Sequence, residues 1–270
     1  MREPGPSPSA FPDVAAGWRR WLAAGLDLLF PPLCPLCRAR LGEGRRDPLC
    51  GPCWVRLPRL GPPYCARCGK PFYTFDPDGR GDTGQPAPLS VGLCEPCQRQ
   101  PPPFTYARAA TLYHGTVREA LHAFKFGRKP GLARPLGDLL AEAGHAMLSR
   151  DGVDCLVPVP LHAAREAERG FNQSLLLARR LSWRWGVPVA DRALKRARVT
   201  RPQSELSAQE RRSNVRGAFV LRRPHAVARA HVLLIDDIFT TGATVSECCR
   251  ALLSAGGART VGVLTVARVP

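Results

Sequence analysis

Two adjacent carboxylates and a threonine-rich turn form the segment of this chain with the clearest chemistry. Asp236 and Asp237 follow an aliphatic run, Val232–Ile235, and precede the turn Thr240–Thr244. Carboxylate oxygens accept hydrogen bonds from vicinal hydroxyl groups and are also ligands for Mg²⁺. Threonine hydroxyls and the backbone N–H groups of a turn before a helix suit a phosphate group. The segment therefore predicts a site for a phosphorylated ligand that carries hydroxyl groups.

The elements around this segment explain why an anion would bind there. We expect a buried strand over Val232–Ile235 that ends at the carboxylates, and a helix over Val245–Ala255. The first N–H groups of a helix have no intrahelical partner, and the helix dipole favours negative charge at that end. Gly242 lets the backbone approach a ligand and adopt conformations that a Cβ forbids. The alternative is a parallel strand, a turn and a helix that carry only surface acids.

The loop with which type I phosphoribosyltransferases bind phosphoribosyl pyrophosphate closely resembles residues 231–244, which read HVLLIDDIFTTGAT. The resemblance implies that Asp236 and Asp237 hold the ribose 2- and 3-hydroxyl groups. It also implies that the 5-phosphate lies on the residues of the turn, which are Thr240, Thr241, Gly242, Ala243 and Thr244.

Two arginines upstream are candidates for a second phosphate-binding element. Arg165 and Arg169 lie four residues apart, so they would share one face of a helix. Guanidinium groups bind phosphate in a bidentate manner. We expect Asn172 to cap the following helix, and we expect a structural role for His162 rather than contact with a ligand.

Further strings resemble the ComF family of competence-related proteins. They are PVPLHAAREAERGFNQ at Pro158–Gln173, the series Gln203, Leu206, Arg211, Asn214 and Gly217–Phe219, and TVAR at Thr265–Arg268. The resemblance implies an α/β fold with a parallel-sheet, type I phosphoribosyltransferase-like domain, preceded by a small zinc-ribbon domain whose metal sites each use four cysteines. The loop at 232–244 motivates an enzyme hypothesis: the protein would bind phosphoribosyl pyrophosphate with Mg²⁺, and Arg165, Arg169 and the metal would stabilise the leaving pyrophosphate.

Three functions remain open at this point. The first is a phosphoribosyltransferase whose acceptor would bind in a hood built from residues around 104–130 and 192–220, with Lys125 and Phe126 as candidates by position. The second follows from the ComF resemblance: a module that handles incoming single-stranded DNA in the cytosol, beside a helicase-like ATPase and recombination mediators. The third is a ligand sensor without turnover, because Phe239 and Thr240 stand where catalytic relatives often have a carboxylate.

The cysteines predict zinc rather than disulfides. Eleven cysteines occur without a recognisable secretory signal, which favours a reducing cytosol, and eight of them form C-x-x-C pairs. Two such pairs supply the four thiolates of a structural zinc site. Joining consecutive pairs closes the shorter loops, although interleaved pairing and a single zinc remain possible. The pairs are Cys34/Cys37, Cys50/Cys53, Cys65/Cys68 and Cys94/Cys97. We expect Cys155, Cys248 and Cys249 to lie in the core.

The charge of the chain favours polyanionic ligands. The formal net charge is +17, and residues 106–270 carry 26 basic and 13 acidic side chains. Such a field suits a pyrophosphate-bearing substrate or a nucleic acid. Residues 192–223 alone carry 10 basic and 2 acidic side chains, which predicts a loop that closes over the site, a contact with nucleic acid, or a solvated basic segment. No apolar run is long enough to cross a membrane.

The chain divides into three parts by composition. We expect an N-terminal arm with a helix over residues 1–33, a double zinc ribbon over 34–100 and the phosphoribosyltransferase-like domain over 104–270, after a proline-rich linker. Alternating strands and helices in the last part predict a parallel sheet with both faces covered. The expected strands are Tyr106–Tyr113, Asp154–Pro160, Val187–Val189 and Thr260–Val266, and the expected helices are Val117–Lys125, Leu132–Leu148 and Asn172–Trp185.

Overall fold

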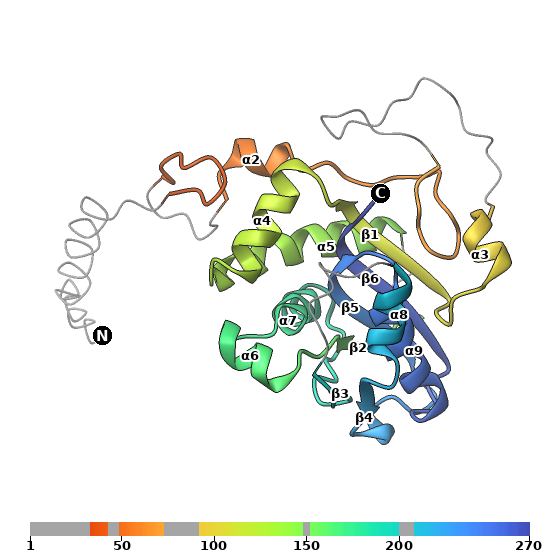
Figure 1. Ribbon diagram of the computed structural model, residues 1–270. Coiled ribbons are helices and arrows are strands. Elements are labelled where there is room, and N and C mark those ends of the chain that lie inside the picture. Colours follow the sequence, from red (N-terminus) through yellow and green to blue (C-terminus); the bar gives the residue numbers. More distant parts are fainter. Residues whose placement is uncertain (1–32, 43–48, 73–91, 148–151, 200–207) are drawn as a thin grey trace, which may run out of the picture.

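A four-stranded parallel sheet forms the centre of the molecule (Figure 1). The computed structural model describes residues 33–42, 49–72, 92–147, 152–199 and 208–270, so nearly all of the predicted N-terminal arm lies outside it. All neighbouring strands of the sheet are parallel, which confirms the predicted fold class. In spatial order they are β1 (Tyr106–Leu112), β6 (Thr260–Arg268), β5 (His231–Phe239) and β2 (Cys155–Pro158).

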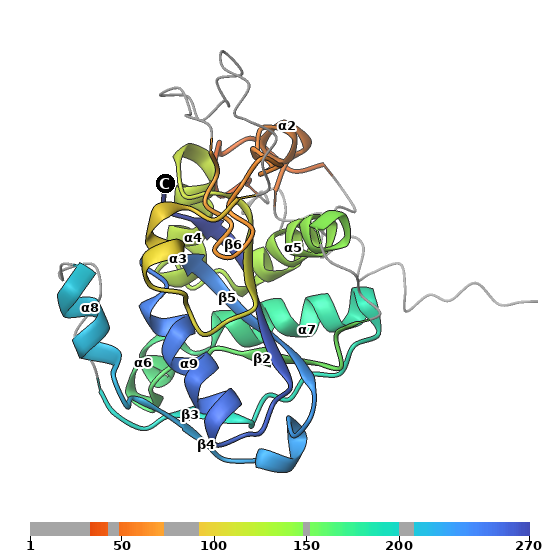
Figure 2. The same cartoon turned by 90° about the vertical axis from the view of Figure 1, so that its right-hand side faces the viewer.

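Helices cover both faces of this sheet (Figure 2). Helices α4 (Gly115–Lys125), α5 (Ala133–Met147) and α7 (Gln173–Trp185) lie on one side, and α9 (Ala243–Ser254) lies on the other. Alternate side chains of β5 enter the two cores: Leu233 and Ile235 pack with α5 and α7, while Val232 and Leu234 pack with α9. The run is apolar without interruption because both faces are buried.

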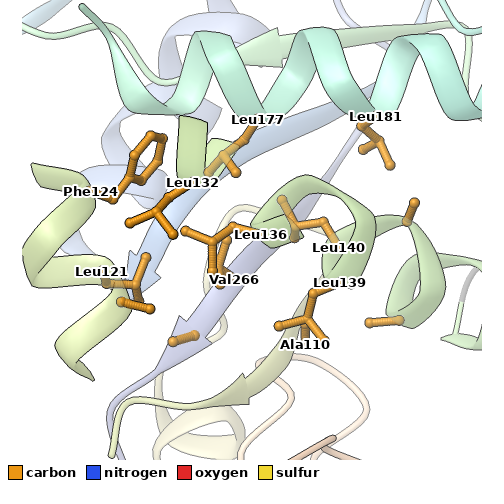
Figure 3. Close-up of a cluster of buried hydrophobic side chains, with 14 of the residues drawn as sticks. Ala110, Leu121, Phe124, Leu132, Leu136, Leu139, Leu140, Leu177, Leu181 and Val266 are labelled. Atoms are coloured by element: carbon orange, nitrogen blue, oxygen red, sulfur yellow. The ribbon is translucent and has the colours of Figure 1, made fainter. Parts of the chain in front are cut away.

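Leucines of α5 and α7 fill the larger of the two cores (Figure 3). Leu136 and Leu140 on α5 meet Leu177 and Leu181 on α7, and all four are fully buried. Their spacing of four residues places each pair on one face of its helix. This packing fixes α7 against β5, and therefore holds the first turn of α7 close to the end of that strand.

Two of the central strands extend further than we expected. Strand β5 does not end at Ile235 but continues through Asp236 and Asp237 to Phe239, because β6 also continues, to Arg268, and pairs with it along this length. The predicted strand Val187–Val189 forms only a single bridge between Leu156 and Val189. The other expected strands and helices of the second part are present, with ends that differ by a few residues.

Two short strands form a second, separate sheet. Strands β3 (Leu194–Arg196) and β4 (Phe219–Leu221) pair antiparallel, and α8 (Ala208–Val215) lies between them in the chain. A short helix, α6 (Ala163–Arg169), connects β2 to α7, and two 3-10 turns cover Pro130–Leu132 and Pro224–Ala226. In the part of the chain that the structure describes, no helix is long and apolar enough to cross a membrane.

The cysteine-rich segment covers the open edge of the sheet. Strand β1 is an edge strand, and the Leu60 N–H donates to the Ala110 carbonyl over 2.9 Å. The Ala107 N–H donates to the Arg67 carbonyl over 2.7 Å. Unpaired edges invite pairing with other chains, so this segment protects the sheet as well as carrying the cysteines. Its short helices are α2 (Gly51–Val55) and α3 (Glu95–Arg99).

Candidate functional site

The two carboxylates lie at the carboxyl end of β5 and have different partners. Asp236 Oδ1 accepts hydrogen bonds from Ser174 Oγ at 3.0 Å and from the Asp237 N–H at 2.9 Å. Asp237 is 7 % exposed, and its Oδ2 lies 2.9 Å from Lys125 Nζ at the end of α4. Ligands of open α/β sheets bind at the carboxyl ends of the strands. The pair is therefore held in place from both neighbouring helices.

A predicted helix cap explains the position of Ser174. Asn172 Oδ1 accepts from the Ser174 N–H at 3.0 Å and from the Leu175 N–H at 3.4 Å, which confirms the expected cap of α7. The Asn172 side-chain amide donates to the Val159 carbonyl at 3.1 Å, just beyond the end of β2. These bonds fix the first turn of α7 beside β5, and Ser174 then reaches Asp236.

Burial of the carboxylate raises the pKa of Asp236 to about 7, and the negative charge of Asp237 contributes in the same direction. Lys125, the Asp237 N–H and Ser174 act against this rise in pKa. In the free protein, Asp236 is therefore partly protonated near neutral pH. A ligand that brings cations or hydroxyl donors to this edge would favour the ionised form.

This shift predicts a pH-dependent gain in stability when Asp236 is replaced by asparagine. A raised pKa in the folded state means that folding takes up a proton, so the charged carboxylate costs stability, increasingly as the pH rises from about 4 to about 7. Asp236→Asn removes that cost. Without Mg²⁺ at pH 8, we expect its free energy of unfolding to exceed that of the parent by on the order of 2 kcal/mol. Urea unfolding at pH 8 and at pH 6 checks this: the difference should shrink at pH 6, and equal differences would contradict it.

The threonine-rich turn connects β5 to α9 as the sequence predicts. Gly242 has a φ of 75°, in the left-handed region, and precedes the first residue of α9. A Cβ at this position would lie 2.7 Å from Cζ of Phe239, so a side chain would displace either the ring or the turn. The Ala243 N–H donates to Thr241 Oγ1 at 3.4 Å. Gly242 itself brings no capping side chain to the first amides of α9.

The two predicted arginines lie on α6 and differ in their surroundings. His162 caps this helix, with its Nδ1 accepting from the Ala164 N–H at 3.3 Å, which is the structural role that we expected. Arg169 is half-buried, and its guanidinium lies 5.4 Å from the centre of the Phe126 ring. Burial lowers the pKa of Arg169, while the charge of Asp237 opposes this effect. Arg165 instead forms an exposed pair with Glu168 at 3.4 Å.

Three further residues belong to this site. Lys125 entered the sequence analysis only as a position in the hood, and its contact with Asp237 depends on the packing of α4, which no local pattern reveals. Ser174 was not predicted, although the expected cap at Asn172 places it in the first turn of α7. Arg196 on β3 also interacts electrostatically with Asp236 and Arg165. The carboxyl end of β5 therefore combines two carboxylates with several cations.

The eight cysteines of the C-x-x-C pairs form two groups of four. In each group all four sulfur atoms lie within 4.8 Å of one another, and the pairs combine in sequential order: Cys34, Cys37, Cys50 and Cys53 in the first group, and Cys65, Cys68, Cys94 and Cys97 in the second. Representative Sγ–Sγ distances are 3.4 Å for Cys37 and Cys50, and 3.6 Å for Cys68 and Cys94. Zinc–sulfur bonds of about 2.3 Å in a tetrahedron require similar separations. Both groups are consistent with structural zinc.

Backbone N–H groups favour the thiolate form of one cysteine in each group. Burial raises the pKa of Cys34 and Cys65, but backbone hydrogen bonds outweigh it and lower both values to about 6. The Cys94 N–H, for example, donates to Cys65 Sγ at 3.3 Å. Metal binding requires the thiolate form, so this environment suits a cation. Cys155, Cys248 and Cys249 are buried in the core, as expected.

Known proteins resemble the chain along most of its length. Residues 25–98 match the double zinc ribbon domain family. The chain is 36 % identical to the DNA utilization protein YhgH of Escherichia coli O157:H7, over 89 % of this chain and 99 % of that protein. This chain belongs to the ComF family. It is also 29 % identical to competence protein F of Haemophilus influenzae, over 83 % of this chain and 91 % of that protein. Identity to competence protein ComFC of Bacillus subtilis is 25 %, over 82 % and 85 % of the two chains.

Membership of the ComF family accounts for the combination of a double zinc ribbon with a parallel sheet. The TVAR string that suggested the family ends at Arg268, which is buried at the end of β6. The PVPLH string contains the end of β2 and leads into α6. Two of the ComF strings therefore lie at the same edge of the sheet as Asp236 and Asp237, because β2 and β6 both flank β5.

Proposed function

We propose that this ComF protein binds phosphoribosyl pyrophosphate with Mg²⁺ at the carboxyl end of β5. The observation that carries the proposal is the continuous path from Asp236 and Asp237 through the Gly242 turn into α9. Carboxylate oxygens, which accept hydrogen bonds from hydroxyl groups, and the start of a helix, which suits a phosphate, lie within a few residues of each other. The ribose hydroxyls would bind to the carboxylates, and the 5-phosphate would bind to Thr240–Thr244.

The cations around Asp237 support a pyrophosphate at this edge. Lys125 and Arg169 both lie close enough to Asp237 to interact with its charge. Arg165 is exposed on the same helix as Arg169 and has only Glu168 as an ion-pair partner among the described residues. These groups would stabilise the negative charge of a leaving pyrophosphate. Mg²⁺, held by carboxylate and phosphate oxygens, would supply further neutralisation of that charge.

Transfer to an acceptor is the form of this function that we favour, with ligand sensing as the alternative. Phe239 is buried and Thr240 follows it, and neither side chain can act as a general base. This feature favours the sensing alternative. Release of pyrophosphate that depends on an added acceptor would identify a transferase, and binding without release under every acceptor would identify a sensor.

Calorimetric titration of the zinc-loaded protein tests the proposed ligand. We expect saturable binding of phosphoribosyl pyrophosphate in the presence of Mg²⁺, and weaker binding of ribose 5-phosphate and of pyrophosphate alone, because each of these occupies only part of the site. Equal affinity for pyrophosphate alone would show that the ribose does not bind to the carboxylates. Absence of binding for all three ligands would overturn the proposal.

A second candidate function is the handling of single-stranded DNA in the cytosol, where free thiols and zinc sites persist. Relatives named DNA utilization protein and competence protein favour it, as do the arginines beside the small β3–β4 sheet. Arg192, Arg222 and Arg223 line a hollow of about 190 Å³ there. Within the described ranges, no carboxylate pairs with these three side chains. The hollow therefore offers unneutralised positive charge to a phosphate backbone. The helicase-like ATPase implied by the family resemblance remains a prediction.

Replacing Arg222 and Arg223 by glutamine should weaken binding of single-stranded DNA and make it less sensitive to salt. Each phosphate contact that is lost reduces the slope of log affinity against log salt by about 0.7, so the double variant should lose roughly 1.4. Fluorescence anisotropy with a labelled oligonucleotide across a salt series measures this slope. The matched control is Arg179→Gln/Arg184→Gln on α7, because these arginines already face Asp191 and Asp138. Equal slopes in the parent and the Arg222→Gln/Arg223→Gln variant would exclude these two arginines as DNA contacts.

A further inference from the structure

A buried arginine connects the second cysteine group to the main sheet. Arg268 is 6 % exposed, and its Nη1 donates to the Cys68 carbonyl at 2.6 Å. Its backbone is fixed as well, because the Tyr113 N–H donates to the Arg268 carbonyl at 2.7 Å. In Figures 1 and 2 the C-terminal end of the chain accordingly lies beside the cysteine-rich segment. The backbone of Arg268 is therefore fixed in the sheet, and its guanidinium is fixed by the Cys68 carbonyl in the zinc ribbon.

The same guanidinium contacts the residue that precedes the phosphate loop. Arg268 lies 5.2 Å from the centre of the Phe239 ring, and the two residues are partners in the pairing of β5 with β6. Phe104, which follows the proline-rich linker, packs edge-on against this ring at 6.0 Å. Cations lie favourably over aromatic faces, so the arginine and Phe104 together restrict the ring.

Phe239 in turn limits the conformation of the turn at Gly242. The Phe239 ring occupies the space where a side chain at Gly242 would lie, and Gly242 holds a left-handed conformation directly before α9. A change in the ring position would therefore alter the turn that presents the first amides of α9. Contacts run without a gap from Cys68 through Arg268 and Phe239 to Gly242.

We propose that the second cysteine group positions the phosphate loop, with Arg268 as the positioning residue. A zinc ion with four thiolates carries a net negative charge, and the buried guanidinium beside Cys68 is the cation suited to balance it. Arg268 thus joins the metal site to the loop by charge on one side and by packing on the other. The ligand part of this proposal rests on the proposed function, but the coupling of the two sites does not.

The first cysteine group does not take part in this connection. Cys34, Cys50 and Cys53 belong to the core formed with α4 and α5, on the face of the sheet opposite to α9. Phe239 and Ala243 belong to the core on the α9 side. The proposal therefore distinguishes the two groups: only the second one should influence the loop.

Arg268→Met tests the coupling, with Arg108→Met as the matched control. Arg108 also donates to a ribbon carbonyl, that of Ala66 at 3.0 Å, and stacks on Tyr64 at 4.7 Å, but these contacts do not involve Phe239. Hydrogen exchange of residues 239–245 is the first readout, zinc content is the second and affinity for phosphoribosyl pyrophosphate is the third. Arg268→Lys keeps the charge but loses the planar fork.

We expect Arg268→Met to speed exchange of residues 239–245 at least tenfold, to lose one of two zinc equivalents in a mild chelator and to bind the ligand at least tenfold more weakly. Arg268→Lys should keep the zinc and show part of the loop effect, and Arg108→Met should leave the loop unchanged. Unchanged exchange of the loop in Arg268→Met would overturn the coupling, whatever the ligand result. Altered exchange together with a parent protein that binds no ligand would leave the coupling intact and overturn the proposed function instead.

Discussion

Asp236→Asn/Asp237→Asn is expected to bind phosphoribosyl pyrophosphate with Mg²⁺ at least 100-fold more weakly than the parent. Each carboxylate would accept a charge-assisted hydrogen bond from a ribose hydroxyl, and such bonds contribute about 1.5–3 kcal/mol. The loss of two therefore exceeds the roughly 2.7 kcal/mol that separates hundredfold affinities. The substitution preserves shape, and a buried, apolar strand carries both residues, so β5 should remain in place.

Titration calorimetry of both proteins, with circular dichroism to verify folding, measures this difference. Asp191→Asn is the matched control, because this carboxylate is exposed and Arg179, at 4.0 Å, is its only ion-pair partner among the described residues. The control should bind the ligand as the parent does. Equal affinity in the double variant and the parent would remove the assignment of Asp236 and Asp237 to the ribose.

Removal of zinc should unfold the cysteine-rich segment and expose the edge of the main sheet. The segment is small and its two cysteine groups are consistent with structural zinc, so we expect metal binding to supply much of its folding free energy. When it unfolds, the hydrogen bonds from Leu60 to Ala110 and from Ala107 to Arg67 are lost. We expect the midpoint of thermal unfolding to fall by on the order of 10 °C, together with aggregation through the free edge of β1.

Differential scanning fluorimetry and hydrogen exchange check this prediction in protein treated with a strong chelator. Peptides that contain the Ala107 amide should lose protection, while peptides from the centre of β5 should keep it, because β2 and β6 still flank that strand. Adding zinc back should restore both the midpoint of thermal unfolding and the protection of the Ala107 amide. Chelated protein in which the Ala107 amide stays protected would show that the segment folds without metal.

Local sequence patterns were sufficient for the features whose causes are local. The apolar run of β5 is buried on both faces, the Asn172 cap forms as expected, and the C-x-x-C pairs combine in chain order. In each case the information lies within a few residues: uninterrupted hydrophobicity, a side chain that competes for helix amides, or a short loop between thiolates.

Features that depend on contacts between distant segments were not predicted. Lys125 reaches Asp237 only because the end of α4 lies beside the carboxyl end of β5, and the extension of β5 to Phe239 depends on pairing with β6. The contact of Arg268 with Cys68 joins residues that lie 200 positions apart in the chain. No periodicity or spacing encodes such contacts, because they follow from packing of complete elements. The ComF strings mark some of these residues without indicating their partners.

A crystal structure of the zinc-loaded protein with phosphoribosyl pyrophosphate and Mg²⁺ tests the central claim most directly. The account predicts density for the 5-phosphate against Thr240–Thr244, for the ribose against Asp236 and Asp237, and for the pyrophosphate on the side of Lys125 and Arg169. Density for the ligand in the hollow of Arg192, Arg222 and Arg223 instead, with the end of β5 vacant at saturating ligand, would contradict it.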